Sequence, residues 1–339
     1  MIVTRDLLGR QLGDLRVSVT DRCNFRCAYC MPKEVFGKGF RFLPRAEILD
    51  FEEVARVVEA ATTLGVRKVR LTGGEPLLRR DLPVLVRMLA DLPGVEDLAL
   101  TTNGALLAKS AQRLAQAGLH RVTVSLDSID PDTFLLMNGV GAPIGVVLEG
   151  IEEAVRAGLG PIKLNAVVRR GINEVGVLPL AEYAREHGHR LRLIEYMDVG
   201  ESHGWRMDEV VPSRELVESI GARWPLEAVV GGDAAAVARR YRYLDGAGEI
   251  GVISSVTEPF CGHCTRLRLT ADGKLHTCLF ARLGHDLRPS LRGGVDREGL
   301  IEEIRAIWGR RVDRYSELRS GSVQQAHSLG KPEMSYLGG

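Results

Sequence analysis

Residues 15–30 read LRVSVTDRCNFRCAYC, an apolar strand followed at once by three cysteines. The spacing of Cys23, Cys27 and Cys30 lets a single loop present all three thiols to one metal group. Three thiolates can hold three corners of an iron–sulfur cube, whereas a fully ligated cluster takes four. The fourth iron is then open, and an open coordination position is typical of a reactive metal site rather than a structural one.

Two other metal sites fit this stretch less well. A zinc site lacks its fourth ligand, because no histidine adjoins the three cysteines. Ferredoxin-type electron carriers have different spacings and a fourth cysteine. The stretch therefore favours a cluster with one open iron.

The composition is that of an ordinary globular protein, with 339 residues, 45% apolar and 26% charged. Its 45 basic residues against 44 acidic ones give a net charge of +1, so no global field favours nucleic acid. No apolar run approaches the ~20 residues of a membrane span, and the N-terminus has no secretory signal pattern. We expect a cytoplasmic protein, in which six cysteines indicate metal binding or catalysis rather than disulfides.

Apolar strands alternate with helical patterns over the first 200 residues. Helices are expected from about residue 50, where Asp50 and Glu53 form a capping-box pattern, and at residues 82–90, 109–117, 146–157 and 178–187. Strands are expected at residues 15–20, 68–71, 97–101, 121–126, 163–168 and 191–197. Six strand–helix repeats without a dinucleotide-binding glycine motif predict an α/β fold with an incomplete, TIM-like (βα)6 barrel.

The pattern changes after about residue 200. Turn residues between short strands predict hairpins over residues 238–254 and 265–279, and an amphipathic helix is expected at residues 296–309. We therefore expect a barrel over residues 1–200, an antiparallel β extension over residues 201–312 and a C-terminal tail over residues 313–339. From composition alone, that tail is expected to be mobile.

A second set of cysteines, Cys261, Cys264 and Cys278, lies in the predicted extension. Zinc is a serious alternative here, because His263 or His276 could supply a fourth ligand. The six cysteines nevertheless divide into three plus three, and each set could leave one iron open. A second open iron could bind part of a substrate.

Positive charges on several predicted strands indicate the class of ligand. In a sheet covered on both faces, such side chains must point into a cavity or be desolvated at a cost of several kcal/mol. Any one of them could be exposed or paired, but a convergent set suits a triphosphate or another polyanion. The set comprises Arg16, Arg70, Lys163, Arg192, Arg266 and Arg268, and Thr101 ends a neighbouring strand.

Other candidate residues also fall at the carboxyl ends of strands, where barrel enzymes place their active sites. In Gly73-Gly74-Glu75-Pro76 the glycines allow close approach of a ligand, and Glu75 could accept a hydrogen bond from an ammonium group. Ser125 and Met197 end two further strands. Taken alone, the glycine motif is equally consistent with a simple turn, and Met197 is better explained by core packing.

The first cysteine motif, with Tyr29 before its last cysteine, resembles the radical S-adenosylmethionine (SAM) superfamily. The resemblance implies that the open iron binds the amino and carboxylate groups of SAM, and that the reduced cluster cleaves SAM to a 5′-deoxyadenosyl radical.

The whole pattern resembles the MoaA family of GTP 3′,8-cyclases, through residues 15–23, 69–76, 163–167 and 261–268. The resemblance implies a second [4Fe-4S] cluster on Cys261, Cys264 and Cys278 whose open iron meets guanine, and two terminal glycines, Gly338 and Gly339, that reach the active site. The implied SAM contacts are Tyr29, Gly74, Ser125 and Met197. The implied GTP contacts are Arg16, Arg70, Thr101, Lys163, Arg266, Leu267 and Arg268, to which the charge pattern adds Arg192.

The expected activity is that of a lyase that takes hydrogen from C3′ of GTP, joins C3′ to C8 and opens molybdenum cofactor biosynthesis. Arg16, Arg266 and Arg268 are the expected catalytic residues. Expected partners are an external electron donor, a downstream cyclic pyranopterin monophosphate synthase and a second copy of the chain. The alternatives are a peptide-modifying radical SAM enzyme with an auxiliary cluster and a zinc-binding adaptor, which the 5% aromatic content disfavours.

Overall fold

The computed structural model describes residues 3–231, 235–319 and 330–338. Its centre is a run of six parallel strands that pair in sequence order within a twelve-stranded sheet. The six are β1 (Asp14–Ser18), β2 (Lys68–Thr72), β3 (Asp97–Thr102), β4 (Arg121–Ser125), β5 (Lys163–Val168) and β6 (Arg190–Glu195). All six were predicted to within a few residues.

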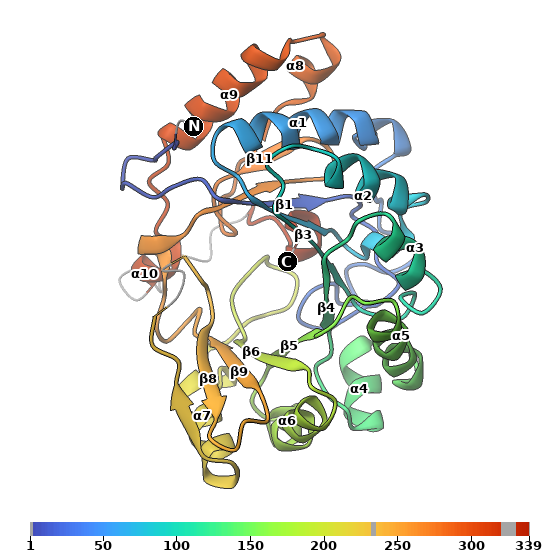
Figure 1. Cartoon of the computed structure of the whole chain (residues 1–339), viewed down its shortest axis with the longest axis vertical. Helices are drawn as coiled ribbons and strands as arrows, with labels where there is room; N and C mark the ends of the chain where they lie inside the picture. The colour runs from blue at the N-terminus through green and yellow to red at the C-terminus, as the bar shows by residue number, and fades with distance from the viewer. Residues whose placement is uncertain (1–2, 232–234, 320–329, 339) are drawn as a thin grey trace.

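Helices surround the outer side of this sheet (Figure 1). They are α1 (Phe51–Thr63), α2 (Leu82–Ala90), α3 (Ala111–Gln116), α4 (Pro131–Asn138), α5 (Gly145–Arg156), α6 (Val177–Glu186) and α7 (Ser213–Arg223). Because β1 and β6 do not pair with each other in the described sheet, the barrel is open. The predicted incomplete α/β barrel is confirmed; α4 and α7 are additional helices that the sequence did not predict.

The predicted capping box begins α1. The Asp50 carboxylate accepts from the Glu53 amide at 2.7 Å, and the Glu53 carboxylate accepts from the Asp50 amide at 2.8 Å. Both backbone donors would otherwise lack an intrahelical partner.

Both predicted hairpins form, and each extends a free edge of the barrel sheet. Strand β10 (Arg266–Leu269) pairs in parallel with β1, and β9 (Glu249–Ile253) pairs in parallel with β6. Beyond them the sheet continues antiparallel through β11 (Lys274–His276) and β12 (His285–Asp286) at one edge and β8 (Arg239–Tyr243) and β7 (Leu226–Ala228) at the other. The register sets Arg16 between Arg70 and Arg268.

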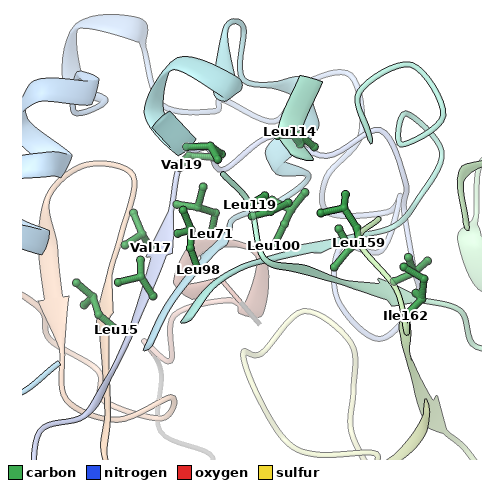
Figure 2. Close-up of a cluster of buried hydrophobic side chains, with 14 of the residues drawn as sticks. Leu15, Val17, Val19, Leu71, Leu98, Leu100, Leu114, Leu119, Leu159 and Ile162 are labelled. Carbon is green, nitrogen blue, oxygen red and sulfur yellow. The ribbon is translucent and has the colours of Figure 1, made fainter. Parts of the chain in front are cut away.

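The main hydrophobic core lies between the sheet and the helices (Figure 2). Leu15 and Val17 of β1 and Leu71 of β2 contribute to it and are fully buried. Each such side chain stabilises the fold by about 1.5–3 kcal/mol. Side chains alternate along a strand, so Arg16 and Arg70, which are next to these leucines and valine in the sequence, project from the opposite face into the barrel.

The chain then returns to the first helix. Helices α8 (Arg288–Arg292) and α9 (Arg297–Gly309) lie against α1, where Arg292 and Arg297 pair with Glu53 and Glu59 at 2.9 and 3.0 Å. Two short helices follow, α10 (Tyr315–Leu318) and α11 (Met334–Leu337). Within the described ranges, no helix is long and apolar enough to cross a membrane.

Candidate active site

The first cysteine loop leaves the carboxyl end of β1 and folds into a tight turn. The amides of Cys30 and Met31 donate to the Cys27 carbonyl at 3.0 and 2.8 Å, and all three thiols are half-buried and free of disulfides. Burial raises the pKa of Cys23 to about 11, and the pKa values of Cys27 and Cys30 are raised further. A bound metal group supplies the positive charge that such buried thiolates need, so this donor set fits an iron–sulfur cluster.

The glycine turn after β2 is joined to this loop by backbone hydrogen bonds. The amide of Gly74 donates to the Thr20 carbonyl and that of Glu75 to the Arg22 carbonyl, both at 2.7 Å. A Cβ at Gly74 would lie 2.2 Å from the Arg22 carbonyl oxygen. Glycine is required here by the close approach of two backbones, which fixes the cysteine loop to the barrel.

Gly74→Ala should therefore shift the cysteine loop and destabilise the protein by about 1–3 kcal/mol, as overpacking of a close contact does. The measurement is thermal unfolding together with iron content after anaerobic reconstitution. Gly145→Ala is the matched control, because a Cβ there meets nothing within 4 Å. Equal stability and equal iron content in both variants would contradict this account of the turn.

Glu75 is almost fully buried and joins the glycine turn to the end of β3. Its carboxylate accepts from the Leu77 amide at 3.0 Å and from the Thr102 hydroxyl and the Asn103 amide at 2.7 Å each. Burial raises its pKa to about 7. Asn103 in turn directs its side-chain amide toward Cys23 at 3.8 Å. Glu75 thus positions this edge of the site, and its predicted contact with an ammonium group stays a prediction.

Tyr29 connects the cysteine loop to the end of β4 through a residue that the sequence reading missed. Its hydroxyl donates to the Asp127 carboxylate at 2.8 Å, and Asp127 also accepts from the Val167 amide at 2.9 Å. Burial raises the pKa of Asp127 to about 6. The sequence does offer one indication of Asp127, because its carboxylate lies two residues after Ser125, directly beyond a predicted strand.

One cavity of about 1320 Å³, including its open mouth, joins most of the predicted site. Its wall contains Tyr29 and Met197 together with all three cysteines of the second set. It also contains Arg16, Arg70, Thr101, Arg192, Arg266 and Arg268.

Five of the predicted SAM and GTP contacts lie outside that wall, as do Cys23, Cys27 and Cys30 of the first set. Lys163 is half-buried on β5, two residues before Asn165, which does line the cavity. Leu267 packs into the core on the opposite face of β10 from its two arginine neighbours. Gly74, Glu75 and Ser125 lie at the strand ends near the first cysteine loop rather than in the cavity wall.

Among the described residues, no carboxylate pairs with the predicted cations of this region. Arg70 donates to the hydroxyls of Thr101 and Thr123 at 3.0 and 3.1 Å. Burial and neighbouring guanidinium groups lower the pKa values of Arg16, Arg70 and Arg192 to about 10 each. Within the described residues, no carboxylate forms an ion pair with any of the six predicted cations. Such a concentration of buried positive charge suits a polyanionic ligand.

The second cysteine set lies at the wall formed by β10 and the segment after β11. Burial raises the pKa of Cys278 to about 11; at Cys264 burial acts in the same direction, but Arg266 and Arg311 outweigh it and lower the pKa to about 6. In the described part of the chain, no three or more His, Cys, Asp or Glu side chains are placed to share one metal ion. A cubane carries each thiolate on a different iron, so this arrangement does not bear against a second cluster, which stays a prediction.

The described end of the chain lies over the barrel. The Gly338 carbonyl accepts from Arg268 Nη1 at 2.5 Å, and Met334 lines the cavity. A Cβ at Gly338 would be 2.4 Å from Thr72 Cγ2, at the end of β2. Figure 1 shows the red segment at the end of the described chain near the barrel centre. Residues 330–338 are therefore placed at the barrel, as the family resemblance implies and composition alone does not, while Gly339 lies outside the described residues.

Family models cover most of the chain. The radical SAM superfamily matches residues 17–184, and Molybdenum Cofactor Synthesis C matches residues 189–317. Among solved structures, SuiB of Streptococcus suis bound to S-adenosylmethionine superposes with a TM-score of 0.61 over 90% of this chain and 69% of its own, at 16% identity. That likeness shows the fold alone.

Curated relatives match over the full length. Proteins named GTP 3′,8-cyclase are 55% identical in Acidothermus cellulolyticus, covering 99% of each chain, and 51% identical in Xanthomonas axonopodis pv. citri, covering 99% of this chain and 98% of the relative. The relative in Staphylococcus aureus is 45% identical over the same shares. Radical SAM membership implies SAM and one [4Fe-4S] cluster, which the first cysteine loop fits. The chain belongs to the GTP 3′,8-cyclase family of the radical SAM superfamily.

Proposed function

We propose that this protein converts GTP to (8S)-3′,8-cyclo-7,8-dihydro-GTP, the first step of molybdenum cofactor biosynthesis. The observation that carries the proposal is a single cavity whose wall contains Tyr29 of the SAM loop, a set of unpaired cations and the second cysteine set. The names of the full-length relatives and the match to Molybdenum Cofactor Synthesis C support it.

When bound to Cys23, Cys27 and Cys30, the cluster together with SAM supplies a radical that removes hydrogen from C3′ of the ribose. The protein's part is to hold SAM in one orientation and keep water away. Tyr29 and Met197 line the cavity on this side, Gly74 follows the end of β2 and Ser125 ends β4. Backbone groups of the glycine turn are the proposed contacts for the SAM amino group.

GTP would lie across the interior face of the sheet. Arg16, Arg70 and Arg192 line the cavity from three strands and are the proposed triphosphate contacts. Lys163 at the start of β5 and Thr101, which accepts from Arg70, are further proposed contacts. Arg266 and Arg268 would position the ribose and base and, with Arg16, stabilise charge that develops during cyclisation. Leu267 can contribute only its backbone, because its side chain is in the core.

A second [4Fe-4S] cluster on Cys261, Cys264 and Cys278 is proposed to bind guanine through its open iron. Anaerobically purified protein should then be brown and contain about eight irons per chain. Cys278→Ala should retain about four, because the first cluster is unaffected. A colourless protein with zinc and no iron would favour the adaptor alternative. About four irons per chain in both the wild type and Cys278→Ala would contradict the proposal of a second cluster.

The peptide-modifying alternative is separated from GTP cyclisation by titration with GTP. The wild type should bind GTP, and Arg266→Ala should bind it more weakly because a buried cation facing the cavity is lost. Absence of GTP binding by the wild type, or equal binding by the variant, would favour the alternative. Nothing in the fold likeness to SuiB favours it, because that likeness is at 16% identity.

We expect the Lys163 side chain to take up a proton when GTP binds. Burial, with Arg192 and Arg121 nearby, lowers the pKa of Lys163 to about 7. An unfolded lysine titrates near ~10.4, so between these pH values the unfolded chain binds a proton that the folded one lacks, and stability rises with pH. A bound polyanion raises the lysine pKa again.

At about pH 8 the wild type should therefore take up as much as about one proton on binding GTP. Calorimetry in buffers of different ionisation enthalpy measures this uptake. It should disappear in Lys163→Met and persist in Lys109→Met, an exposed control. Equal uptake in all three proteins would show that Lys163 does not sense the ligand.

The remaining partners are also proposals. An external donor must reduce the first cluster, and the exposed cations Arg22, Lys33, Lys38, Arg41 and Arg45 flank the cysteine loop and fit an acidic one. A downstream cyclic pyranopterin monophosphate synthase and a homodimer follow from the family resemblance. We also propose the division into residues 1–200, 201–312 and 313–339, which the boundary between the two family matches supports.

A further inference from the structure

Residues 330–338, the C-terminal arm, are held by a buried carboxylate that the proposed chemistry does not use. Asp198 follows Met197 just beyond β6 and is 8% exposed. Three side chains meet it. Lys331 Nζ lies 3.1 Å from Oδ2, the Tyr315 hydroxyl donates to Oδ2 at 2.5 Å, and Arg319 Nη2 lies 2.9 Å from Oδ1.

These three partners come from two separate parts of the chain. Tyr315 and Arg319 lie in and directly after α10, whereas Lys331 lies on the arm. Lys331 Nζ also donates to the Tyr315 hydroxyl at 2.6 Å. Asp198 is therefore the point at which the barrel, α10 and the arm are joined.

The α10 side of this junction is firmly attached to the cavity wall. The Tyr315 ring stacks on Phe280 with centroids 4.2 Å apart, and Phe280 lies two residues after Cys278. Arg319 Nη1 donates to the Ser255 carbonyl at 2.9 Å, just beyond β9. Among the described contacts, those of Lys331 join this side of the junction to the arm.

Beyond Lys331, the arm makes polar contacts along its length. The Glu333 carboxylate accepts from the Ser202 hydroxyl at 2.9 Å, the Tyr336 hydroxyl donates to Asp272 at 2.8 Å, and Gly338 accepts from Arg268. Each of these contacts has one charged partner, whereas the contact between Asp198 and Lys331 joins two opposite charges. The Asp198–Lys331 pair is the buried ion pair among the described contacts of the arm.

We propose that Asp198 is a positioning residue that clamps the C-terminal arm to the barrel, and thereby keeps Gly338 on Arg268 and Met334 in the cavity wall. Its charge is maintained by its surroundings. Burial opposes ionisation of Asp198, but Arg319, Tyr315 and Lys331 outweigh it and hold the carboxyl pKa below its usual range. The kinetic consequence rests on the proposed function, whereas the structural one does not.

Hydrogen exchange of the loaded enzyme, measured by mass spectrometry without turnover, tests the clamp. In Asp198→Asn, which keeps the side-chain volume, amides of residues 333–338 should exchange at least about tenfold faster than in the wild type. Amides of β6 and α9 should be unchanged. Asp245→Asn is the matched control, since it removes an exposed carboxylate paired with Arg185 at 2.7 Å, away from the arm.

Lys331→Met provides a second variant, because its side chain belongs to the arm and its loss removes no barrel core contact. It should reproduce the faster exchange, and the double variant should be no worse than either single one. In turnover, both variants should lower kcat for GTP cyclisation with little change in the KM for SAM. Unchanged arm exchange, or an equal increase in β6, would overturn the clamp. A wild type that does not cyclise GTP would instead overturn the proposed function and leave the exchange result standing.

Discussion

Cys27→Ala should abolish both SAM cleavage and GTP cyclisation, with an expected loss above a hundredfold. Replacing residues that merely orient metal ligands already costs about 10–100-fold, and Cys27 is itself a proposed ligand. Cys27 lies at the turn that Cys30 and Met31 form around its carbonyl, and burial raises the pKa of its thiol. The measurements are iron content and 5′-deoxyadenosine formation after anaerobic reconstitution and reduction.

Cys278→Ala is the matched control for this variant. Each protein should lose about four of about eight irons, but only Cys27→Ala should lose 5′-deoxyadenosine formation. Similar SAM cleavage by the two variants would contradict the assignment of different roles to the two cysteine sets. Retention of all iron by either variant would contradict the corresponding ligand assignment.

Arg268→Ala should lower GTP cyclisation by about 10²–10³, the usual effect of removing one donor that stabilises developing charge. Arg268 is buried in the cavity wall, next to Arg16 across the β1–β10 pairing, and it holds the Gly338 carbonyl at 2.5 Å. The variant loses a cation and the last described contact of the arm together. SAM cleavage by the first cluster should continue, so 5′-deoxyadenosine should exceed cyclised product.

Two further variants separate charge from geometry. Arg268→Lys keeps the charge but loses the planar fork, so we expect only partial recovery of cyclisation. Arg190→Ala removes an exposed arginine at the start of β6 and should behave like the wild type. Full activity in Arg268→Ala, or an equal loss in Arg190→Ala, would contradict the role of this side chain.

The sequence predicted the features that depend on local periodicity. Alternation of apolar and charged residues in β1 places Leu15 in the core and Arg16 in the barrel, and the Asp50–Glu53 pattern begins α1 as expected. The second cysteine spacing and the strand-borne arginines identified groups that line the cavity. These properties are determined by residues close together in the chain.

The pairing of strands that are distant in the chain could not be predicted from local sequence patterns. Nothing local to β10 shows that it pairs with β1, about 250 residues earlier, yet this pairing sets Arg268 beside Arg16. Lys163 lies on its predicted strand but outside the cavity wall, which Asn165, two residues later, does line. Asp127 and Asp198 were missed, since their partners Tyr29 and Lys331 are distant in sequence.

The central claim is that SAM chemistry at the first cysteine loop acts on GTP held in the same cavity. The most direct test uses GTP carrying deuterium at C3′, incubated with fully loaded, reduced enzyme and SAM under anaerobic conditions. Mass spectrometry of the 5′-deoxyadenosine should show one deuterium transferred from GTP, together with formation of the cyclised product. Unlabelled 5′-deoxyadenosine, or none at all from loaded and reduced enzyme, would contradict the account.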